Sequence, residues 1–314
     1  MTDYGRRWAV ILAGGDGTRL RPLTRELAGD DRPKQYCRVL GDETLLEQTR
    51  QRVSRSVSPL RTLVVVTRHH ERFYRDALAD LPPHAVVVQP ENRGTAAGIL
   101  YPLLRLETMT ASNVVALFPS DHYVSDDETF MAHVDAAFDA VRACPDLTVL
   151  LGVRPDRPET EYGWIEPGPP VVPLARQWPL LVSAVRRFWE KLRPKIAAAL
   201  EARGCLWNSF VIVARVTALV GLIRQALPAV YATLAGVRPA FDGPGEAAAV
   251  RDAYAFLPPA DFSREVLAVR PQRLGVLPVS GVTWNDLGDP ARVFATRRQV
   301  ERWASVTRPM AVGQ

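Results

Sequence analysis

Short apolar runs alternate with amphipathic segments through the first half of the chain. The runs predict strands at 8–13, 62–67, 85–89, 113–118 and 147–153. Thr44 and Glu47 have the capping-box spacing that opens a helix, and Ser125 with Glu128 has it again before a second helical pattern. Strands and helices that alternate at this pitch predict an α/β fold, with a mostly parallel sheet covered by helices on both faces.

The second half of the chain follows this alternation less regularly. The proline-rich segment 167–179 is expected to be a loop. Further strands are expected at 181–189, 206–213 and 274–279, and further helices at 194–203, 217–237 and 289–303. Because no repeat or sharp linker interrupts the pattern, we expect one composite domain at 1–288, with halves at 1–158 and 159–288, followed by a helix and tail at 289–314.

Composition narrows the class of protein. The formal charge of the 314 residues is +5, but the basic residues are scattered and not interleaved with aromatic ones, which argues against nucleic acid as a partner. No apolar run is long enough to span a bilayer and no secretory signal is present, which argues against a membrane. Cys37, Cys144 and Cys205 lie far apart without metal-ligand spacing, so we expect a reducing, cytoplasmic environment.

Four segments rich in glycine or polar residues directly follow predicted strands: 14–19, 91–95, 119–122 and 284–288. Ligands bind at the carboxyl ends of strands in an open parallel sheet. In the first segment the glycines let the backbone approach an anion, and Arg19 adds a cation. A tight turn would explain the glycines but not Arg19, so phosphate binding is favoured. Leu20 stands where a dinucleotide fingerprint needs glycine, and no P-loop pattern is present.

The same stretch carries a resemblance to a known family. LAGGDGTRLRPLT followed by RPKQY resembles the signature of the sugar-1-phosphate nucleotidyltransferases, and five further motifs follow in that family's order across 9–288: FPSDH, YGWIEPG, FWEK, LWNSF and TWNDLG. The resemblance implies the nucleotide-diphospho-sugar transferase fold, with a Rossmann-like nucleotide-binding half at 1–158. It implies a smaller, β-containing sugar-binding half at 159–288.

In that family an oxygen of the sugar 1-phosphate attacks the α-phosphorus of a nucleoside triphosphate, and pyrophosphate leaves. The resemblance implies that Asp121 and Asp286 hold Mg²⁺, although a lone aspartate is more often a helix cap or a turn residue. It implies that Arg19 and Lys34 hold the triphosphate and that Lys191 meets the sugar phosphate. The implied nucleotide contacts come from the glycine segment and the segment after the third strand: Ala13, Gly14, Gly15, Gly17, Thr18, Asn92, Gly94 and Thr95.

The implied sugar contacts lie in the second half of the chain. Glu166 and Asn208 match positions that bind sugar hydroxyls, and Gly163 matches a backbone contact to the sugar. Without the neighbouring motifs, Glu166 would be taken as a solvated loop carboxylate and Asn208 as a turn cap. Leu192 stands where the family usually has proline, and this departure puts the role of Lys191 in doubt.

The identities of the base and the sugar are inferred from less specific features of the sequence. The stretch QPENRGTAAGI at 89–99 resembles the guanylyltransferase form of the base loop, although Gly94 stands where asparagine is common. The PKQY motif and His122 also resemble the mannose-1-phosphate guanylyltransferases, which favours GTP and mannose 1-phosphate. The alternatives are dTTP or UTP with glucose 1-phosphate. The same loop can equally start a helix capped by Thr95.

Two other classes of protein remain to be weighed. A catalytically silent nucleotide-sugar sensor would have lost the carboxylates or cations named above, which are all present, and an oxidoreductase would need the missing glycine. The residues after Gly288 lack the hexapeptide pattern of the left-handed β-helix found in relatives, and the sequence leaves homo-oligomerisation open. We expect His122 to support the site, and the remaining histidines to lie at the surface or in helices: His69, His70, His84 and His133.

Overall fold

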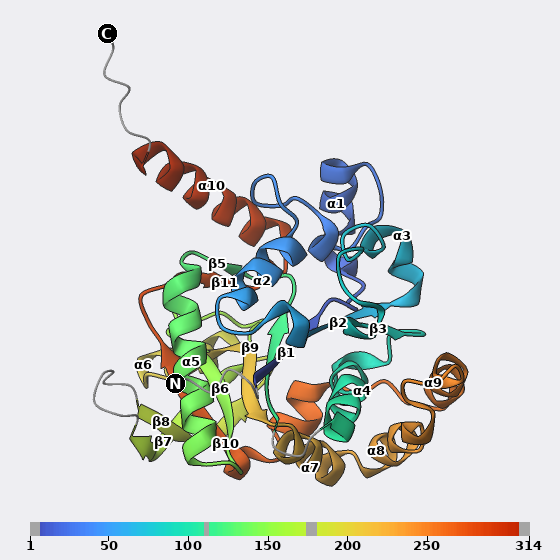
Figure 1. Cartoon of the computed structure of the whole chain (residues 1–314). Helices are drawn as coiled ribbons and strands as arrows, with labels where there is room; N and C mark the ends of the chain where they lie inside the picture. Colours follow the sequence, from blue (N-terminus) through green and yellow to red (C-terminus); the bar gives the residue numbers. More distant parts are fainter. Residues whose placement is uncertain (1–6, 110–112, 174–180, 308–314) are drawn as a thin grey trace.

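A nine-stranded sheet runs through the part of the chain that the structure describes, with helices on both faces (Figure 1). This computed structural model describes residues 7–109, 113–173 and 181–307. The strand order is β3-β2-β1-β4-β9-β6-β10-β8-β7. Four strands at one end pair in parallel and lie within a residue or so of their predicted bounds: β1 (Arg7–Leu12), β2 (Thr62–Thr67), β3 (Val86–Gln89) and β4 (Val114–Pro119).

The rest of the sheet is mixed. The strand β9 (Leu206–Arg215) comes from the second half of the chain and pairs antiparallel with β4 and with β6 (Thr148–Val153) of the first half. Next, β10 (Leu274–Val279) pairs in parallel with β6, and β8 (Leu181–Trp189) pairs antiparallel with β10. The expected α/β fold is confirmed, with antiparallel strands added beyond its parallel part.

Side chains alternate between two hydrophobic cores along the central strands. Val10 and Val65 pack into one core, whereas Ile11 and Val64 pack into the core on the opposite face. Strands buried on both faces read as continuous apolar runs, which is why the sequence pattern located them. The helices are α1 (Arg21–Ala28), α2 (Leu45–Ser54), α3 (Glu71–Tyr74), α4 (Gly94–Met109), α5 (Asp127–Ala143), α6 (Pro194–Ala202), α7 (Val216–Ala226), α8 (Pro228–Ala235), α9 (Glu246–Ala255) and α10 (Pro290–Thr307).

The prediction that the proline-rich segment is a loop is wrong for residues 167–173. Residues 167–173 belong to β7 (Trp164–Pro173), which pairs antiparallel with β8 at the end of the sheet; residues 174–180 lie outside the described residues. Proline cannot donate to a ladder, so it is confined to edge strands and bulges. The register between β7 and β8 shifts at Pro167 and Pro170, which is how the edge accommodates them.

Two helix predictions also need correction. The single helix expected at 217–237 is two helices, α7 and α8, because Pro228 lacks the N–H that would continue the first. The cap of α5 is Asp126, whose carboxylate accepts from the Thr129 N–H, and not Ser125, whose hydroxyl accepts from the Thr283 N–H. The capping box of Thr44 with Glu47 is confirmed.

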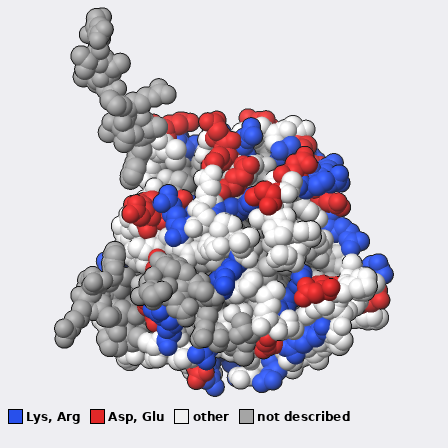
Figure 2. Space-filling model, viewed as in Figure 1, with Lys and Arg blue, Asp and Glu red and all other residues white. Residues whose placement is uncertain are grey.

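Surface features add little to the functional argument. Figure 2 shows acidic and basic side chains interspersed over one face, so the net positive charge is not gathered into a single track there. Within the described residues, no helix is long and apolar enough to cross a membrane.

Candidate functional site

A cavity of about 550 Å³ lies at the carboxyl ends of β1, β3 and β4. All four segments that follow predicted strands contribute to its lining, so their expected convergence is confirmed. The expected site residues that line it are Gly14, Gly15, Asn92, Gly94, Thr95, Asp121, Gly163, Asn208 and Asp286.

The glycine segment is held in place by the side chains of the PKQY motif. Gln35 Nε2 donates to the carbonyls of Ala13 (3.0 Å) and Gly15 (2.8 Å), and the Tyr36 hydroxyl donates to Ala13 at 2.9 Å. The Ala13 N–H donates to Val65 in the sheet. Ala13 is therefore buried and its backbone groups are used within the protein, which leaves Gly14 and Gly15 at the cavity wall.

The end of the glycine segment lies at the cavity rim. Gly17 has φ +56°, and a Cβ there would lie 3.3 Å from the backbone nitrogen of Lys34. Thr18 is exposed, as is Arg19, whose guanidinium lies 3.5 Å from the carboxylate of Glu161, a cavity residue. Gly17, Thr18 and Arg19 do not themselves line the cavity, and the ion pair with Glu161 holds the exposed Arg19 side chain at its rim.

Lys34 joins two of the converging segments. It lies in a short helical turn (Lys34–Tyr36), and its side chain is buried. Its Nζ lies 3.2 Å from Asp121 Oδ2 and donates to the carbonyls of Asp286 and Leu287, the latter at 3.1 Å. The ammonium is thus fixed between the Asp121 carboxylate and the backbone of Asp286, and its charge helps to hold the pKa of Asp286 below the ordinary value.

Asp286 is held ionised by its surroundings. Burial alone would raise its pKa, but His122, Arg292 and Lys34 outweigh burial and hold the pKa below the ordinary value. Arg292 Nη1 and the Gly288 N–H both donate to Oδ1 at 2.8 Å. Sequence reasoning missed Arg292, which reaches back from α10, and no motif marked it.

His122 lies beside Asp121 and itself lines the cavity. Its ring is edge-on to Trp284 with centroids 5.2 Å apart, and its Nε2 lies 3.7 Å from Asp121 Oδ1. Burial lowers the pKa of its imidazole, whereas the charge of Asp121 acts in the opposite direction. Of the other histidines, His69 and His70 lie in a helical turn and His133 in α5; His70 and His133 are buried.

The segment after β3 forms a loop that opens α4, so the helix-start interpretation is confirmed. Asn92 Oδ1 accepts from the Gly94 N–H at 3.0 Å, whereas Thr95 Oγ1 accepts from the Phe262 N–H at 2.8 Å. Thr95 is therefore not the cap that the sequence suggested. The Ala260 N–H donates to the Arg93 carbonyl, which holds the loop against the segment that follows α9.

Gly94→Ala should destabilise the protein more than Gly29→Ala. Both glycines have positive φ, +82° and +75°, but a Cβ at Gly94 would lie 2.3 Å from the Ala260 carbonyl oxygen, whereas Gly29 has open space. We expect a loss of about 1 kcal/mol at Gly29 and roughly 2–4 kcal/mol at Gly94 in urea unfolding. Equal losses would mean that backbone strain alone determines both.

Gly163, Glu190 and Asn208 are among the residues from the second half of the chain that line the cavity. The Gly163 carbonyl accepts from the Asn208 N–H at 2.8 Å, and Asn208 Oδ1 accepts from the Phe210 N–H at 3.1 Å. A Cβ at Gly163 would lie 2.7 Å from Glu190 Oε1, so any larger residue there would displace the Glu190 carboxylate. Burial, with Asp261 nearby, raises the pKa of Glu190 to about 7. Sequence reasoning missed Glu190, although the FWEK motif contains it.

Glu166 and Lys191 are not brought to the cavity. On β7 side chains alternate, so Glu166 lies on the face opposite to Gly163, buried and ion-paired with Arg203 and with Arg186 at 3.6 Å. Lys191 is exposed, with φ +51°, beside Glu190. The Leu192 N–H donates to the Thr160 carbonyl at 3.3 Å, a bond that the family's proline could not form.

Comparison with known proteins agrees with this arrangement. Residues 8–302 match the family model described as nucleotidyl transferase. XanB, a xanthan biosynthesis protein of Xanthomonas campestris pv. campestris (strain B100), is 32% identical over 70% of this chain and 44% of its own. A mannose-1-phosphate guanylyltransferase of Sinorhizobium fredii (strain NBRC 101917 / NGR234) is 30% identical over 72% of this chain and 43% of its own. The chain thus spans less than half of either relative.

A solved structure from Thermus thermophilus covers more of the chain. It is described as a mannose-1-phosphate geranyltransferase, superposes with a TM-score of 0.76 at 29% identity, and covers 92% of this chain and 79% of its own. The similarity extends over both halves of the fold that surround the cavity.

Proposed function

Because this chain belongs to the nucleotidyl transferase family, we propose that it transfers a guanylyl group from GTP to mannose 1-phosphate, giving GDP-mannose and pyrophosphate. The observation that carries the proposal is that two carboxylates, the glycine segment and the loop that opens α4 line one cavity. Lys34 does not line it, but its ammonium bridges Asp121 and the Asp286 carbonyl just behind the cavity wall. Relatives whose names specify mannose 1-phosphate support the choice of sugar and base.

Asp121 and Asp286 fit a magnesium ion. Both line the cavity, and the surroundings of Asp286 hold it ionised. Mg²⁺ takes oxygen ligands and is commonly held by one or two carboxylates together with substrate phosphates. When bound, the ion would neutralise charge on the phosphate chain.

The chain's own groups position the triphosphate. Gly14 and Gly15 both line the cavity, and the exposed backbone of Gly15 is where phosphate oxygens can approach closely. Lys34 is already fixed by two carbonyls and Asp121, so its charge is in place before substrate arrives. The attacking phosphate oxygen is already anionic, so positioning and charge neutralisation provide most of the acceleration.

The sugar would occupy the side of the cavity formed by the second half of the chain. Asn208 and Glu190 both line it, and the pKa of about 7 lets Glu190 accept or donate a hydrogen bond to a sugar hydroxyl. The location of Glu166 on the opposite face favours Glu190 as the carboxylate that contacts the sugar.

Purified protein with Mg²⁺, GTP and mannose 1-phosphate should release pyrophosphate and form GDP-mannose in equal amounts. Omitting either substrate should stop both. A protein that binds GDP-mannose tightly but releases no pyrophosphate under any combination would instead be a silent nucleotide-sugar sensor.

Lys191 is exposed and outside the cavity, so its long side chain would have to turn toward the sugar phosphate when that substrate binds. Lys191→Ala should then raise the KM for the sugar phosphate by roughly tenfold or more while changing the KM for the nucleotide little. A hydrogen bond to a charged group contributes about 1.5–3 kcal/mol, and Lys and Ala carry the same cost at positive φ. Lys195→Ala, which removes an exposed lysine four residues along, is the matched control and should change neither KM. Equal effects on both substrates would displace Lys191 from the sugar phosphate.

A further inference from the structure

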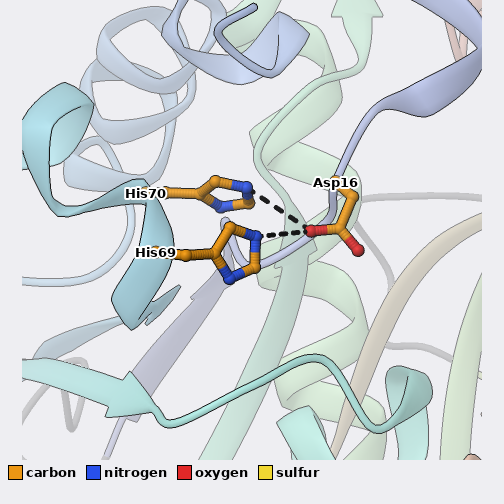
Figure 3. Close-up of side chains that lie close together, drawn as sticks. All are labelled: Asp16, His69 and His70. Atoms are coloured by element: carbon orange, nitrogen blue, oxygen red, sulfur yellow. Dashed lines mark hydrogen bonds and ion pairs between the residues drawn. The ribbon is translucent and has the colours of Figure 1, made fainter.

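Three metal-ligating side chains converge beside the glycine segment, outside the set of residues used above (Figure 3). Asp16 comes from the loop after β1, and His69 and His70 come from the helical turn after β2. His69 Nε2 lies 2.9 Å and His70 Nε2 lies 3.4 Å from the same oxygen, Asp16 Oδ1. Both imidazole rings are directed at that carboxylate.

We propose that Asp16, His69 and His70 bind a divalent transition-metal ion of the zinc class, at a site separate from Asp121 and Asp286. Two imidazoles and one carboxylate are ligands that Zn²⁺ and its neighbours prefer over Mg²⁺. Ligands about 2.0–2.1 Å from one ion are about 2.8–3.0 Å apart in octahedral and about 3.3–3.4 Å apart in tetrahedral geometry. The two distances from Asp16 Oδ1 match that spacing closely, and one donor atom from each residue lies within 4.8 Å of the others.

The surroundings hold the three ligands in place. Asn92 Nδ2 donates to the other oxygen of Asp16 at 2.8 Å, the kind of outer contact that orients a ligating carboxylate. The His70 ring is buried and packs edge-on against His69 and Tyr36, with centroids 4.0 and 6.1 Å away. The hydroxyl of Tyr36 in turn bonds Ala13 in the glycine segment. Little rearrangement would therefore be needed to bind the ion.

The protonation state of His70 also suits a metal ligand. Burial, reinforced by His69, lowers its pKa to about 4, so the ring is neutral at neutral pH and protons compete weakly for its nitrogen. Its Nδ1 has no hydrogen-bond partner among the described residues. The ring proton can therefore reside on Nδ1, which leaves Nε2 unprotonated for the ion. The positive charge of Arg21 disfavours any cation at this site. An ion that binds here must therefore gain its binding free energy from strong bonds to imidazole, which favours zinc-class ions over Mg²⁺.

A bound ion would tie the glycine segment to the end of β2. Asn92, which contacts both Asp16 and the Gly94 N–H, extends the connection to the start of α4. Three protein ligands also leave one coordination position open. The ion would thus fix two walls of the cavity without belonging to the carboxylate pair at Asp121 and Asp286.

The test is a Co²⁺ titration of untagged, chelator-treated protein in excess Mg²⁺, followed by visible absorption and by competition with Zn²⁺. We expect one Co²⁺ per chain, displaced by Zn²⁺, with affinity weakened more than roughly tenfold in Asp16→Asn and in His69→Ala. The side chain of His69 is half exposed, so its loss should leave the fold intact, which far-UV circular dichroism checks. His84→Ala removes an exposed histidine elsewhere and should bind like the parent.

A second readout is the thermal midpoint. Zn²⁺ should raise it in the parent protein and in Asp286→Asn, but much less in His69→Ala, because a ligand that binds only the folded state stabilises it. The proposal would be overturned by the absence of saturable Co²⁺ binding. Binding unchanged in His69→Ala, or lost in Asp286→Asn, would overturn it equally.

Discussion

Asp121→Asn and Asp286→Asn should each lower turnover by roughly 10²- to 10⁴-fold while leaving the protein folded. Both carboxylates line the cavity, and Lys34 contacts one of them and the backbone of the other residue. Removing either charge takes one ligand from the same proposed ion, so the double variant should lose little more than the worse single variant. Steady-state kinetics with saturating substrates measures this directly.

Asp289→Asn is the matched control for Asp286→Asn. Asp289 Oδ2 lies 2.9 Å from Nε of Arg292, the guanidinium that also contacts Asp286, but Asp289 does not line the cavity. Asp289→Asn should keep nearly normal turnover. Asp121→Asn, Asp286→Asn and Asp289→Asn should all unfold at similar urea concentrations. Near-normal activity in Asp286→Asn, or equal losses in Asp286→Asn and Asp289→Asn, would remove Asp286 from the catalytic role.

The convergence of four segments on one cavity was predictable because each strand before them is a continuous apolar run. Residues 62–67 are buried on both faces of the sheet. A strand buried in this way reads as a nearly continuous apolar run, a pattern that turns do not have. The order of the parallel strands then places their carboxyl ends together. In contrast, the edge position of β7 leaves no such signal, since prolines at 167–173 are equally compatible with a loop.

Residues that act across the fold were the ones the sequence could not identify. Arg292 reaches Asp286 from α10, and Glu190 meets Gly163 only because β7 and β8 pair antiparallel. His69 and Asp16 are 53 residues apart in the sequence. They meet, with His70 beside them, because β1 and β2 are neighbours in the sheet. Single-residue patterns carry no record of these pairings. The position of Glu166 was equally hidden, because the sequence did not predict the strand β7 that carries it.

GTP should be used far faster than any other nucleoside triphosphate, because the loop that opens α4 can match the guanine edge. Guanine offers O6 as acceptor, with N1–H and N2–H₂ as donors. Asn92 and Gly94 lie at the cavity wall. The Asn92 oxygen accepts from the Gly94 N–H and one Nδ2 hydrogen goes to Asp16, so the second Nδ2 hydrogen is the group that would meet guanine O6. A buried site built around such groups discriminates by roughly 10²-fold or more, since a base that lacks the partners leaves them unpaired.

The measurement is pyrophosphate release with Mg²⁺ and mannose 1-phosphate across GTP, ITP, ATP, UTP, CTP and dTTP. ITP is the matched control, because it differs from GTP only in lacking the 2-amino group, and it should fall between GTP and ATP. The contribution of that amino group is a hydrogen bond, expected to contribute about 0.5–1.5 kcal/mol. A panel in which dTTP or UTP is fastest, or in which glucose 1-phosphate exceeds mannose 1-phosphate, would leave nucleotidyl transfer in place. The loop at Asn92 would then be reading a different base edge, and the guanylyl and mannose assignments would both fall.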